Sequence, residues 1–358
     1  MENYLLILAG GKGNRLWPIS TERKPKQFIS LYGSEIMINE TIRRVENIFK
    51  YENIFIIINE EQLELAYRYV DNKIPRKNII TEPKMKNTAM CIFLATLKIK
   101  KMRGDGIISI LSSDHYIEDV NKLQKNILEA IEIAKNDGNI VTIGIEPTYP
   151  ATGFGYIKYD KSNCKEKYYL VKEFKEKPNY DTAIEFLSSN QYVWNSGMFI
   201  WKIETILSNF EKYLPSIYVF KNTLYDSFQT DNEQEVTMRI YEMIEPISID
   251  KGILEKSNLI KMIKADFKWM DIGSIKDFFE VHLKDSINNV IIGNAITRNI
   301  ENVNIYNNTD ELLVTIGVDN ISVIKNNNVC VICNSENIDG ISKIHEEIKN
   351  QEEYKKFM

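Results

Sequence analysis

The sequence predicts an α/β protein in which a doubly wound sheet precedes a small β-rich domain. Over the first 145 residues, short apolar runs alternate with segments whose apolar residues recur at helical spacing. Continuous apolar strands that alternate with helices favour a parallel sheet covered on both faces. Beyond residue 287, long helical patterns end, Asn becomes frequent and short strand patterns recur. We therefore expect one large domain over residues 1–286 and a β-rich domain over residues 287–358.

The elements of the large domain follow from these two patterns. Strands are expected at residues 4–9, 53–58, 78–80, 106–111 and 140–145, and again at 168–175 and 192–199. Helices are expected at residues 38–49, 63–70, 87–97 and 120–134, and residues 203–241 are mostly helical in pattern.

The second domain contains short strand patterns separated by Gly and Asn. They lie at residues 289–293, 303–306, 312–317, 321–324 and 329–332, and an amphipathic helix at 338–349 closes the chain. A short left-handed β-helix fits this series. Because such a solenoid has exposed end faces, we expect it to pack against a second copy in a homodimer.

Composition indicates a globular protein with a sizeable core. Of the 358 residues, 44% are apolar and 27% are charged, and the net charge is −5. The sequence has no basic block that could neutralise many phosphates, so nucleic acid is not an expected partner. No apolar run approaches the roughly 20 residues of a membrane-spanning helix. We therefore expect a cytoplasmic protein without a membrane partner.

Cysteine and histidine give little evidence of a metal centre. Cys330 and Cys333 have C-x-x-C spacing, but they lie in an apolar strand pattern without a second pair. Residues three apart in a strand point to opposite faces, so we interpret both as ordinary sheet residues. The three histidines are too scattered along the sequence for a histidine-ligated cluster.

A glycine-rich loop directly follows the first predicted strand. Gly10, Gly11 and Gly13 let the backbone turn tightly and bring its N–H groups close to an anion. Arg15 offers a planar fork of donors that suits phosphate, and Lys26 offers a compact charge. Neither the dinucleotide fingerprint, whose third glycine is replaced at residue 16, nor the P-loop pattern is present. The loop predicts a phosphate site of another kind.

A carboxylate follows the strand that is predicted at residues 106–111. In doubly wound sheets, ligands bind outside the carboxyl ends of the strands, so Asp114 is expected near the glycine-rich loop. Mg²⁺ is typically held by one or two carboxylates and phosphate oxygens. Residue spacing alone also allows Asp114 to cap the following helix.

The glycine-rich loop and the segment after it resemble the signature of the sugar-1-phosphate nucleotidyltransferases. Residues 16–18 (Leu-Trp-Pro) and 25–28 (Pro-Lys-Gln-Phe) point within that family to the mannose-1-phosphate guanylyltransferase branch. The resemblance covers nearly the whole chain and implies a Rossmann-like mixed sheet of the nucleotidyltransferase type. It also implies Mg²⁺ as the cofactor. GTP and α-D-mannose 1-phosphate would be the substrates, and GDP-mannose and pyrophosphate the products.

The resemblance assigns catalytic roles to four residues. The segment around Asp271 (Trp-Met-Asp-Ile-Gly-Ser) resembles the family's second metal-bearing motif, which makes Asp271 and Asp114 the ligands of one Mg²⁺. Taken alone, the same segment would equally suit a turn and a helix cap. Arg15 would stabilise the departing pyrophosphate, and Lys26 would neutralise the attacking or the attacked phosphate.

Two further groups would bind the substrates. For the nucleotide, the resemblance implies Leu8, Gly10, Gly11, Gly13, Glu82, Asn87 and Thr88. For the sugar phosphate, it implies Gly155, Glu176, Lys177 and Asn195. The sequence departs from the family at residues 112–113 (Ser-Ser for Pro-Ala) and at residues 85–86 (Met-Lys for Gly-Arg). A lysine is not a neutral replacement for an arginine fork.

Three alternatives differ in class or substrate. The same chemistry could act on another sugar 1-phosphate, for example a heptose 1-phosphate, or on another nucleoside triphosphate. A catalytically silent regulatory homologue would be expected to lack Arg15, Lys26 or an aspartate, and all of these are present. A nicotinamide-dependent oxidoreductase is disfavoured by Leu16 at the third glycine position.

Overall fold

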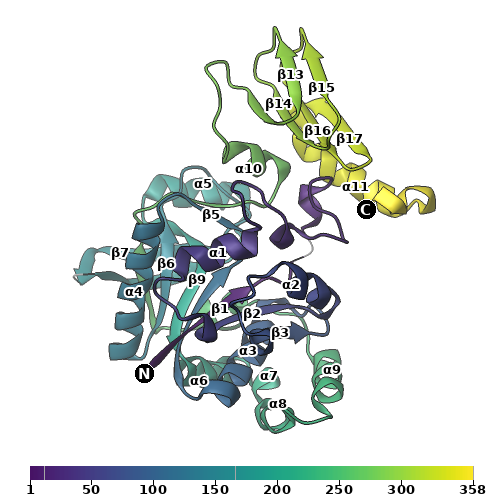
Figure 1. The fold of residues 1–358 in the computed structure, drawn as a ribbon. Helices are drawn as coiled ribbons and strands as arrows, with labels where there is room; N and C mark the ends of the chain where they lie inside the picture. Colours follow the sequence, from purple (N-terminus) through teal and green to yellow (C-terminus); the bar gives the residue numbers. More distant parts are fainter. Residues whose placement is uncertain (12, 166, 358) are drawn as a thin grey trace. The chain divides into compact units, whose positions relative to one another are not determined.

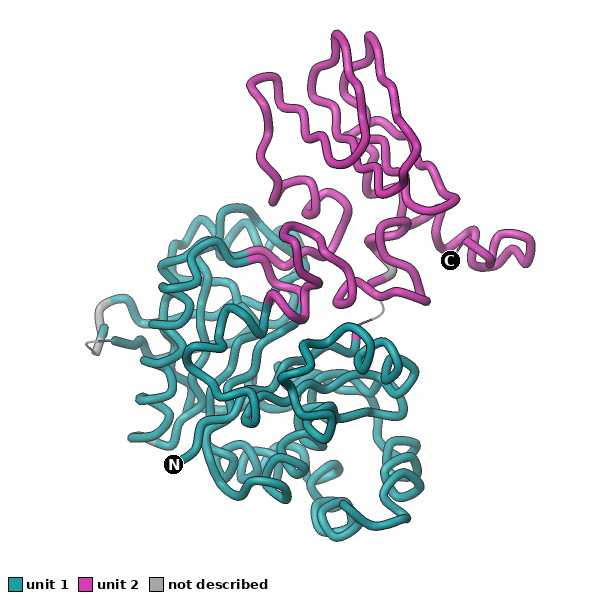
Figure 2. The backbone as a smooth tube through the Cα atoms, in the orientation of Figure 1, with its two compact units in different colours: residues 1–10, 41–113, 117–269 teal, residues 11–40, 114–116, 270–358 magenta. Residues whose placement is uncertain are grey.

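The computed structural model describes residues 1–11, 13–165 and 167–357, so Lys12 of the glycine-rich loop lies outside the described residues. The chain forms two compact units whose segments alternate along the sequence (Figure 2). Unit 1 comprises Met1–Gly10, Thr41–Ser113 and Ile117–Trp269. Unit 2 comprises Gly11–Glu40, Asp114–Tyr116 and Met270–Met358. Most of the glycine-rich loop therefore belongs to the same unit as the C-terminal strands.

Unit 1 is built on a sheet, several of whose strands are labelled in Figure 1. The sheet has nine strands in the order β3-β2-β1-β4-β9-β6-β10-β8-β7. Its strands are β1 (Glu2–Leu8), β2 (Ile54–Asn59), β3 (Ile79–Glu82), β4 (Gly106–Ser112), β6 (Ile140–Ile145), β7 (Tyr156–Lys165), β8 (Tyr168–Lys175), β9 (Tyr192–Lys202) and β10 (Ile260–Lys264). β3, β2, β1 and β4 are parallel, whereas β9 is antiparallel to both β4 and β6. The predicted mixed, doubly wound sheet is confirmed.

Helices cover this sheet on both faces. The helices of this part of the chain are α1 (Met37–Val45), α2 (Leu63–Tyr69), α3 (Asn87–Arg103), α4 (Val120–Asp137), α5 (Tyr180–Ser189), α6 (Ile203–Tyr213), α7 (Pro215–Tyr218), α8 (Lys221–Ser227) and α9 (Glu233–Met243). Leu6 of β1 and Ile110 of β4 share one core with α3 and α6. Their neighbours point to the other face because side chains alternate along a strand. There α4 packs on β4, β6 and β9.

The boundaries of α4 show how local sequence sets an element. The side chain of Asp119 accepts a hydrogen bond from the Lys122 N–H and so caps the first turn. Gly138 ends the helix with φ +65°, a left-handed conformation that glycine adopts at low cost. The predicted span of 120–134 is therefore extended to Asp137.

The C-terminal strands of unit 2 pair in parallel, except the last, which is antiparallel to the strand before it. Its elements are β5 (His115–Ile117) and β11 (Trp269–Asp271), which pair with each other, α10 (Ile275–Glu280), β12 (Val290–Gly293), β13 (Ala295–Arg298), β14 (Asn304–Asn308), β15 (Leu313–Ile316), β16 (Ile321–Asn326), β17 (Val329–Asn334) and α11 (Ile341–Lys349). β13 pairs with β15, and β14 pairs with β16, with partners 18 residues apart. Asparagine side chains follow the same offset, as in the hydrogen bond from Asn302 to Asn320. This repeat is the arrangement of a short β-solenoid.

The apolar half of the first loop packs within unit 2. Leu16 and Trp17 are buried in one core with Phe278, Tyr306 and Ile324. The Trp17 indole N–H donates to the Phe357 carbonyl at 2.9 Å, and the Asn326 amide donates to the Pro18 carbonyl at 2.6 Å. The Leu-Trp-Pro segment therefore anchors the loop, which explains why a phosphate-type loop carries large apolar residues.

Sequence patterns missed several short elements. β10, β13 and α10 were not predicted, and the helical stretch at 203–241 divides into four helices, α6 to α9. Within the part of the chain that the structure describes, no helix has the length and apolar character that crossing a membrane demands.

Candidate active site

The carboxyl ends of the parallel strands of unit 1 form one edge. Leu8 pairs in register with Ser112 of β4, and Asn59 of β2 pairs with Glu82 of β3. The Leu8 carbonyl accepts the Ser113 N–H at 3.0 Å, which ties the ends of β1 and β4 together. This edge is where the fold class places ligands.

Gly10 continues β1 along this edge. A Cβ atom added to Gly10 would lie 3.0 Å from Glu82 Oε1, so a larger residue would crowd that carboxylate. Glu82 is only 5% exposed. Two of the predicted nucleotide-binding residues therefore lie in direct contact within unit 1.

Within unit 2, Gly13 brings the loop close to Lys26. Gly13 has φ +68°, and a Cβ there would lie 3.0 Å from the Lys26 backbone nitrogen, so glycine is favoured on both counts. The Ser20 hydroxyl donates to the Gly13 carbonyl at 2.6 Å, and the Gln27 amide donates to the Gly11 carbonyl at 3.0 Å. These bonds hold the loop in one shape.

Lys26 forms a cluster with two aspartates from distant parts of the sequence. Its ammonium group pairs with Asp114 Oδ2 and lies 3.8 Å from Asp271 Oδ1. We call Lys26, Asp114 and Asp271 the acid–lysine cluster. Burial alone would lower the pKa of Lys26, but the two carboxylates outweigh it and raise that pKa above its ordinary value.

The two carboxylates of the acid–lysine cluster differ in charge balance. Burial would raise the pKa of Asp114, yet the adjacent Lys26 lowers it below its ordinary value. Burial and the neighbouring Asp114 raise the pKa of Asp271. One ammonium group therefore does not fully compensate two carboxylates, and the cluster favours a further cation.

The cluster has the donors that a divalent metal ion needs. Ligand atoms of Asp114, His115 and Asp271 all lie within 4.8 Å of one another. Asp271 Oδ1 is buried and accepts no hydrogen bond from the described residues. Hard divalent cations prefer carboxylate oxygens, so Asp114 and Asp271 fit such an ion and His115 is a nearby nitrogen donor.

Arg15 lies beside the same cluster in unit 2. A Cβ on Gly273, two residues after Asp271, would be 3.6 Å from Arg15 Nη2. The guanidinium group also acts on Asp271, whose pKa it lowers against the stronger effects of burial and Asp114. The structure thus brings together all four residues that the sequence nominated for catalysis.

Asn87 and Thr88 open helix α3 in unit 1. Asn87 has φ +65°, and its side chain accepts the Thr88 N–H at 2.8 Å. The Thr88 hydroxyl accepts the Ile249 N–H at 2.9 Å, so this helix start is tied to the segment that precedes Asp250.

The predicted sugar-phosphate residues also meet within unit 1. A Cβ on Gly155 would lie 2.8 Å from Glu176 Oε2, and the Asn195 N–H donates to the Gly155 carbonyl at 2.8 Å. Lys177 pairs with Glu176 at 3.2 Å, and 61% of the Lys177 side chain is exposed. Three of the four residues are packed together, and the lysine lies at their rim.

Asp250 belongs to this group and has no role in the sequence-based prediction. Its Oδ1 accepts a hydrogen bond from Asn195 Nδ2 at 3.0 Å. Burial, and after it the charge of Glu176, raise the pKa of Asp250 to about 7. The Ser-Ile-Asp sequence at residues 248–250 was the available signal, but nothing in its spacing indicates which residue Asp250 meets.

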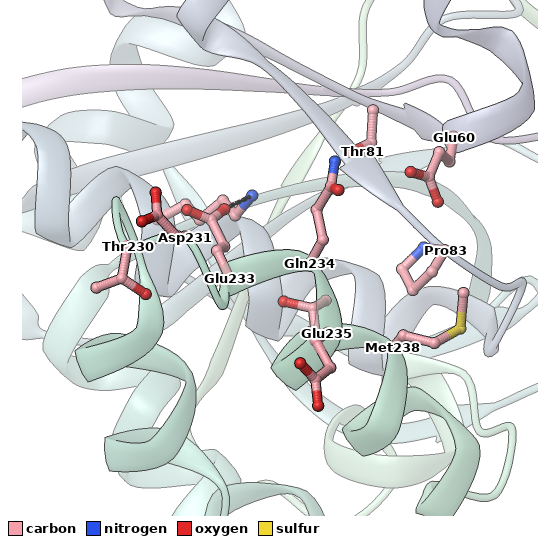
Figure 3. Close-up of a pocket in the computed structure, with 11 residues that line it drawn as sticks. Glu60, Thr81, Pro83, Thr230, Asp231, Glu233, Gln234, Glu235 and Met238 are labelled. Carbon is pink, nitrogen blue, oxygen red and sulfur yellow. Dashed lines mark ion pairs between the residues drawn. The ribbon is translucent and has the colours of Figure 1, made fainter.

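A separate cavity of about 590 Å³ lies beside β3 and α9 in unit 1 (Figure 3). Thr81 and Pro83 line one side, and Gln234 and Met238 of α9 line another. The remaining lining includes the carboxylates Glu60, Asp231, Glu233 and Glu235. Lys98 also lines the cavity but is paired with Glu233 at 2.5 Å, so the carboxylates outnumber the positive charge and the cavity does not suit a triphosphate.

Comparisons with known proteins agree with the fold. Residues 4–287 match the model of the nucleotidyl transferase family. The chain therefore belongs to the nucleotidyl transferase family. Within it, the chain is 33% identical over 350 residues to the mannose-1-phosphate guanylyltransferase of Salmonella montevideo, covering 96% of this chain and 73% of that protein.

Two further relatives support the same branch. A mannose-1-phosphate guanylyltransferase of Escherichia coli is 34% identical over 364 residues, covering 98% of this chain and 75% of that protein. The crystal structure of mannose-1-phosphate geranyltransferase from Thermus thermophilus matches with a TM-score of 0.87 at 26% identity, covering 98% of this chain and 100% of that one. The resemblance inferred from the glycine-rich loop is confirmed.

Proposed function

We propose that this protein transfers GMP from GTP to α-D-mannose 1-phosphate and releases pyrophosphate, giving GDP-mannose. The acid–lysine cluster carries this proposal, because residues from three distant parts of the sequence converge there with Arg15 beside them. The choice of guanine and mannose rests on similarity to the mannose-1-phosphate guanylyltransferases over nearly the whole chain.

The proposed reaction needs charge neutralisation more than acid–base chemistry. A phosphate oxygen of mannose 1-phosphate is already ionised and attacks the α-phosphorus of GTP, while pyrophosphate leaves in line. Lys26 would neutralise the attacking or the attacked phosphate, and Arg15 would bind the departing pyrophosphate. No general base and no covalent intermediate are required.

Asp114 and Asp271 would hold Mg²⁺. When bound, this ion supplies positive charge to the phosphates and helps to orient them. The Oδ1 of Asp271, which accepts no hydrogen bond from the described residues, and the incomplete charge balance of the cluster support this assignment. Lys26, already paired with both carboxylates, would keep them oriented.

We assign the substrate-binding residues by the resemblance to the family; apart from Gly11 and Gly13, which belong to unit 2, they lie in unit 1. Leu8, Gly10, Glu82, Asn87 and Thr88 would bind the nucleotide, with Gly11 and Gly13 offering backbone N–H groups to its phosphates. Gly155, Glu176 and Asn195 would bind the sugar, and the exposed Lys177 would reach its phosphate. Fixed polar groups of this kind reject wrong epimers, because a mismatched sugar leaves them unpaired.

We further propose a catalytic domain over residues 1–286, a C-terminal domain over 287–358, and a homodimer formed through the C-terminal strands. Exposed apolar side chains on β13 and β15, Ile296, Val314 and Ile316, support a surface that a second copy covers. We place the enzyme in the cytoplasm, where GTP is available, without nucleic-acid or membrane partners.

The test is direct synthesis by the purified protein. With GTP, mannose 1-phosphate and Mg²⁺, we expect equimolar GDP-mannose and pyrophosphate, measured by anion-exchange chromatography and a coupled phosphate assay. The same assay is repeated with other nucleoside triphosphates and other sugar 1-phosphates, including a heptose 1-phosphate. Faster turnover of any other pair than of GTP with mannose 1-phosphate would overturn the substrate assignment.

A further inference from the structure

Glu82 occupies a defined position at the carboxyl edge of the unit 1 sheet. It ends β3 in register with Asn59, and its Oε1 lies against Gly10, where β1 turns into the glycine-rich loop. A carboxylate at this point faces the region that the fold class reserves for ligands. Its two oxygens are therefore candidates for accepting hydrogen bonds from a bound molecule.

The other oxygen of Glu82 is held by Tyr241. The Tyr241 hydroxyl donates to Glu82 Oε2 at 3.3 Å, and Tyr241 is fully buried on α9. An earlier turn of α9 lies beside Thr81 and Pro83, as Figure 3 shows for Gln234 and Met238. Because side chains alternate along a strand, Glu82 points away from that cavity, toward Gly10 and Tyr241.

The surroundings of Glu82 favour its neutral form. The titratable groups that face it are Tyr241 on α9 and Cys91 on α3. Burial raises the pKa of both well above their ordinary values, so both are neutral near pH 7. Burial likewise raises the pKa of Glu82 to about 7, and the hydrogen bond from Tyr241 acts in the opposite direction.

We propose that Tyr241 is a positioning residue for selection of the nucleotide base, because its hydroxyl fixes the Glu82 carboxylate for N–H donors of guanine. This inference rests on the proposed use of GTP. Guanine presents N1–H and a 2-amino group side by side, and a carboxylate can accept from both. Adenine offers a lone pair at N1 and would be repelled there. Hypoxanthine keeps N1–H but lacks the 2-amino donor.

The experiment compares Tyr241→Phe with the wild type across pH 6 to 9. Loss of the hydroxyl removes a bond that favours ionised Glu82, so the acidic limb of kcat/KM for GTP moves to higher pH. At pH 7 we expect KM for GTP to rise roughly 3- to 10-fold with kcat little changed. The preference for GTP over ITP falls by a similar factor.

Two control variants separate positioning from general damage. Tyr4→Phe removes another buried hydroxyl, which donates to the Arg103 carbonyl at 3.1 Å, and it should keep the wild-type profile. Glu82→Gln removes the titrating group, so adding Tyr241→Phe to it should shift the pH profile no further. Melting temperatures confirm that each variant is folded.

Each outcome decides one proposal. If Tyr241→Phe keeps the wild-type pH midpoint and GTP preference, or if Tyr4→Phe matches its effect, the positioning role is wrong. If no GDP-mannose forms, the proposed function fails by itself. In that case, a pH midpoint for binding of fluorescent GTP that depends on Tyr241 still supports the inference, and one that is independent of Tyr241 overturns it.

Discussion

Two groups of acidic side chains in this molecule compensate their repulsion in different ways. In unit 2, Asp114 and Asp271 share the ammonium group of Lys26, which is itself largely buried. In unit 1, Asp250 lies near Glu176, and the cation next to them, Lys177, is mostly exposed. Exposed ion pairs stabilise charge weakly, so Lys177 compensates the negative charge of the unit 1 group much less than Lys26 compensates that of the acid–lysine cluster.

The difference indicates what each group can bind. The acid–lysine cluster keeps a net negative charge that suits a divalent cation and, through it, phosphate. In unit 1 the pKa of Asp250 is raised to about 7, so a proton takes the place of the missing cation. A group that is close to neutral offers hydrogen bonds to sugar hydroxyls without attracting a metal ion. This difference supports the proposal that the acid–lysine cluster binds phosphate through a metal ion and that the unit 1 group binds the sugar.

The largest effect is expected from Asp271→Asn. The substitution keeps the side-chain volume and removes one of the two charges proposed to hold Mg²⁺, so turnover should fall roughly 10³-fold. The Mg²⁺ concentration that gives half-maximal rate should rise in parallel. Pyrophosphate release over a Mg²⁺ titration measures both quantities.

Asp105→Asn is the matched control for Asp271→Asn, because it makes the same change at an exposed aspartate that is not part of the acid–lysine cluster. Asp105 pairs with Lys100 at 2.5 Å on the surface, where an ion pair contributes little. Turnover of this control should equal that of the wild type. If Asp271→Asn has near-normal turnover and a near-normal Mg²⁺ dependence, the acid–lysine cluster does not hold the metal ion and the assignment is wrong.

Arg15→Ala should have the next largest effect. The side chain is exposed beside Gly273, so its loss should leave the melting temperature nearly unchanged. The guanidinium group is proposed to stabilise charge on the leaving pyrophosphate, and its removal should lower kcat roughly 10²-fold. Steady-state kinetics of GDP-mannose formation measure this effect.

Arg23→Ala tests whether any arginine of this loop would have the same effect. Arg23 is also exposed, and together with Asn308 and Asn326 it lines a cavity of unit 2 that contains no residue of the acid–lysine cluster. Equal losses in the two variants would mean that Arg15 acts through the general positive charge of the loop, and the specific role would be withdrawn.

Asn195→Ala should affect the sugar half of the reaction only. The variant loses one hydrogen-bonding amide and leaves Asp250 without its donor, so KM for mannose 1-phosphate should rise roughly 10-fold. KM for GTP should stay within a factor of two or so. Asn209→Ala removes a buried amide that donates to the Thr205 carbonyl within α6, and it controls for general packing loss. A rise in both KM values in Asn195→Ala would contradict a sugar-specific role.

The sequence predicted the parts of the molecule whose signals are local. The parallel strands β1, β2 and β4 are continuous apolar runs, and Gly13 and Lys26 stand in a recognisable loop. β9 could be predicted as a strand, but its antiparallel place between β4 and β6 depends on pairings across distant sequence. Short strands such as β13 carry too few residues to show a period.

The same distinction applies to the candidate site. Arg15 and Asp271 were nominated because their neighbours form motifs, whereas Asp250 and Tyr241 act on residues far away in sequence. In the sequence, Tyr241 fits the apolar pattern of a helix like its neighbours. Only the fold shows that its hydroxyl contacts Glu82. A residue that positions another side chain belongs to no sequence motif of fixed spacing, so the sequence alone does not reveal it.

The smallest expected effect concerns the pH dependence of stability at Asp250. Its pKa rises from the ordinary value of 3.8 to about 7 on folding. Between these values, a rise in pH removes the proton from the unfolded chain but not from the folded one. Unfolding therefore becomes more favourable as pH increases from about 4 to 7. Asp250→Asn keeps an acceptor for Asn195 and lacks this dependence, so its melting temperature relative to the wild type should increase across that range.

Asp285→Asn distinguishes this effect from the loss of any aspartate. Hydrogen bonds from the backbone and side chain of Asn289 lower the pKa of Asp285, so Asp285 is ionised in both folded and unfolded chains above pH 5. Its substitution should shift the melting temperature by a constant amount between pH 5 and 8. Differential scanning fluorimetry across buffers of one ionic strength resolves the two patterns. If the melting-temperature difference between Asp250→Asn and the wild type is also independent of pH, Asp250 is ionised in the folded protein at neutral pH. In that case a proton does not compensate the charge of the unit 1 group, and the proposed difference between the two acidic groups is wrong.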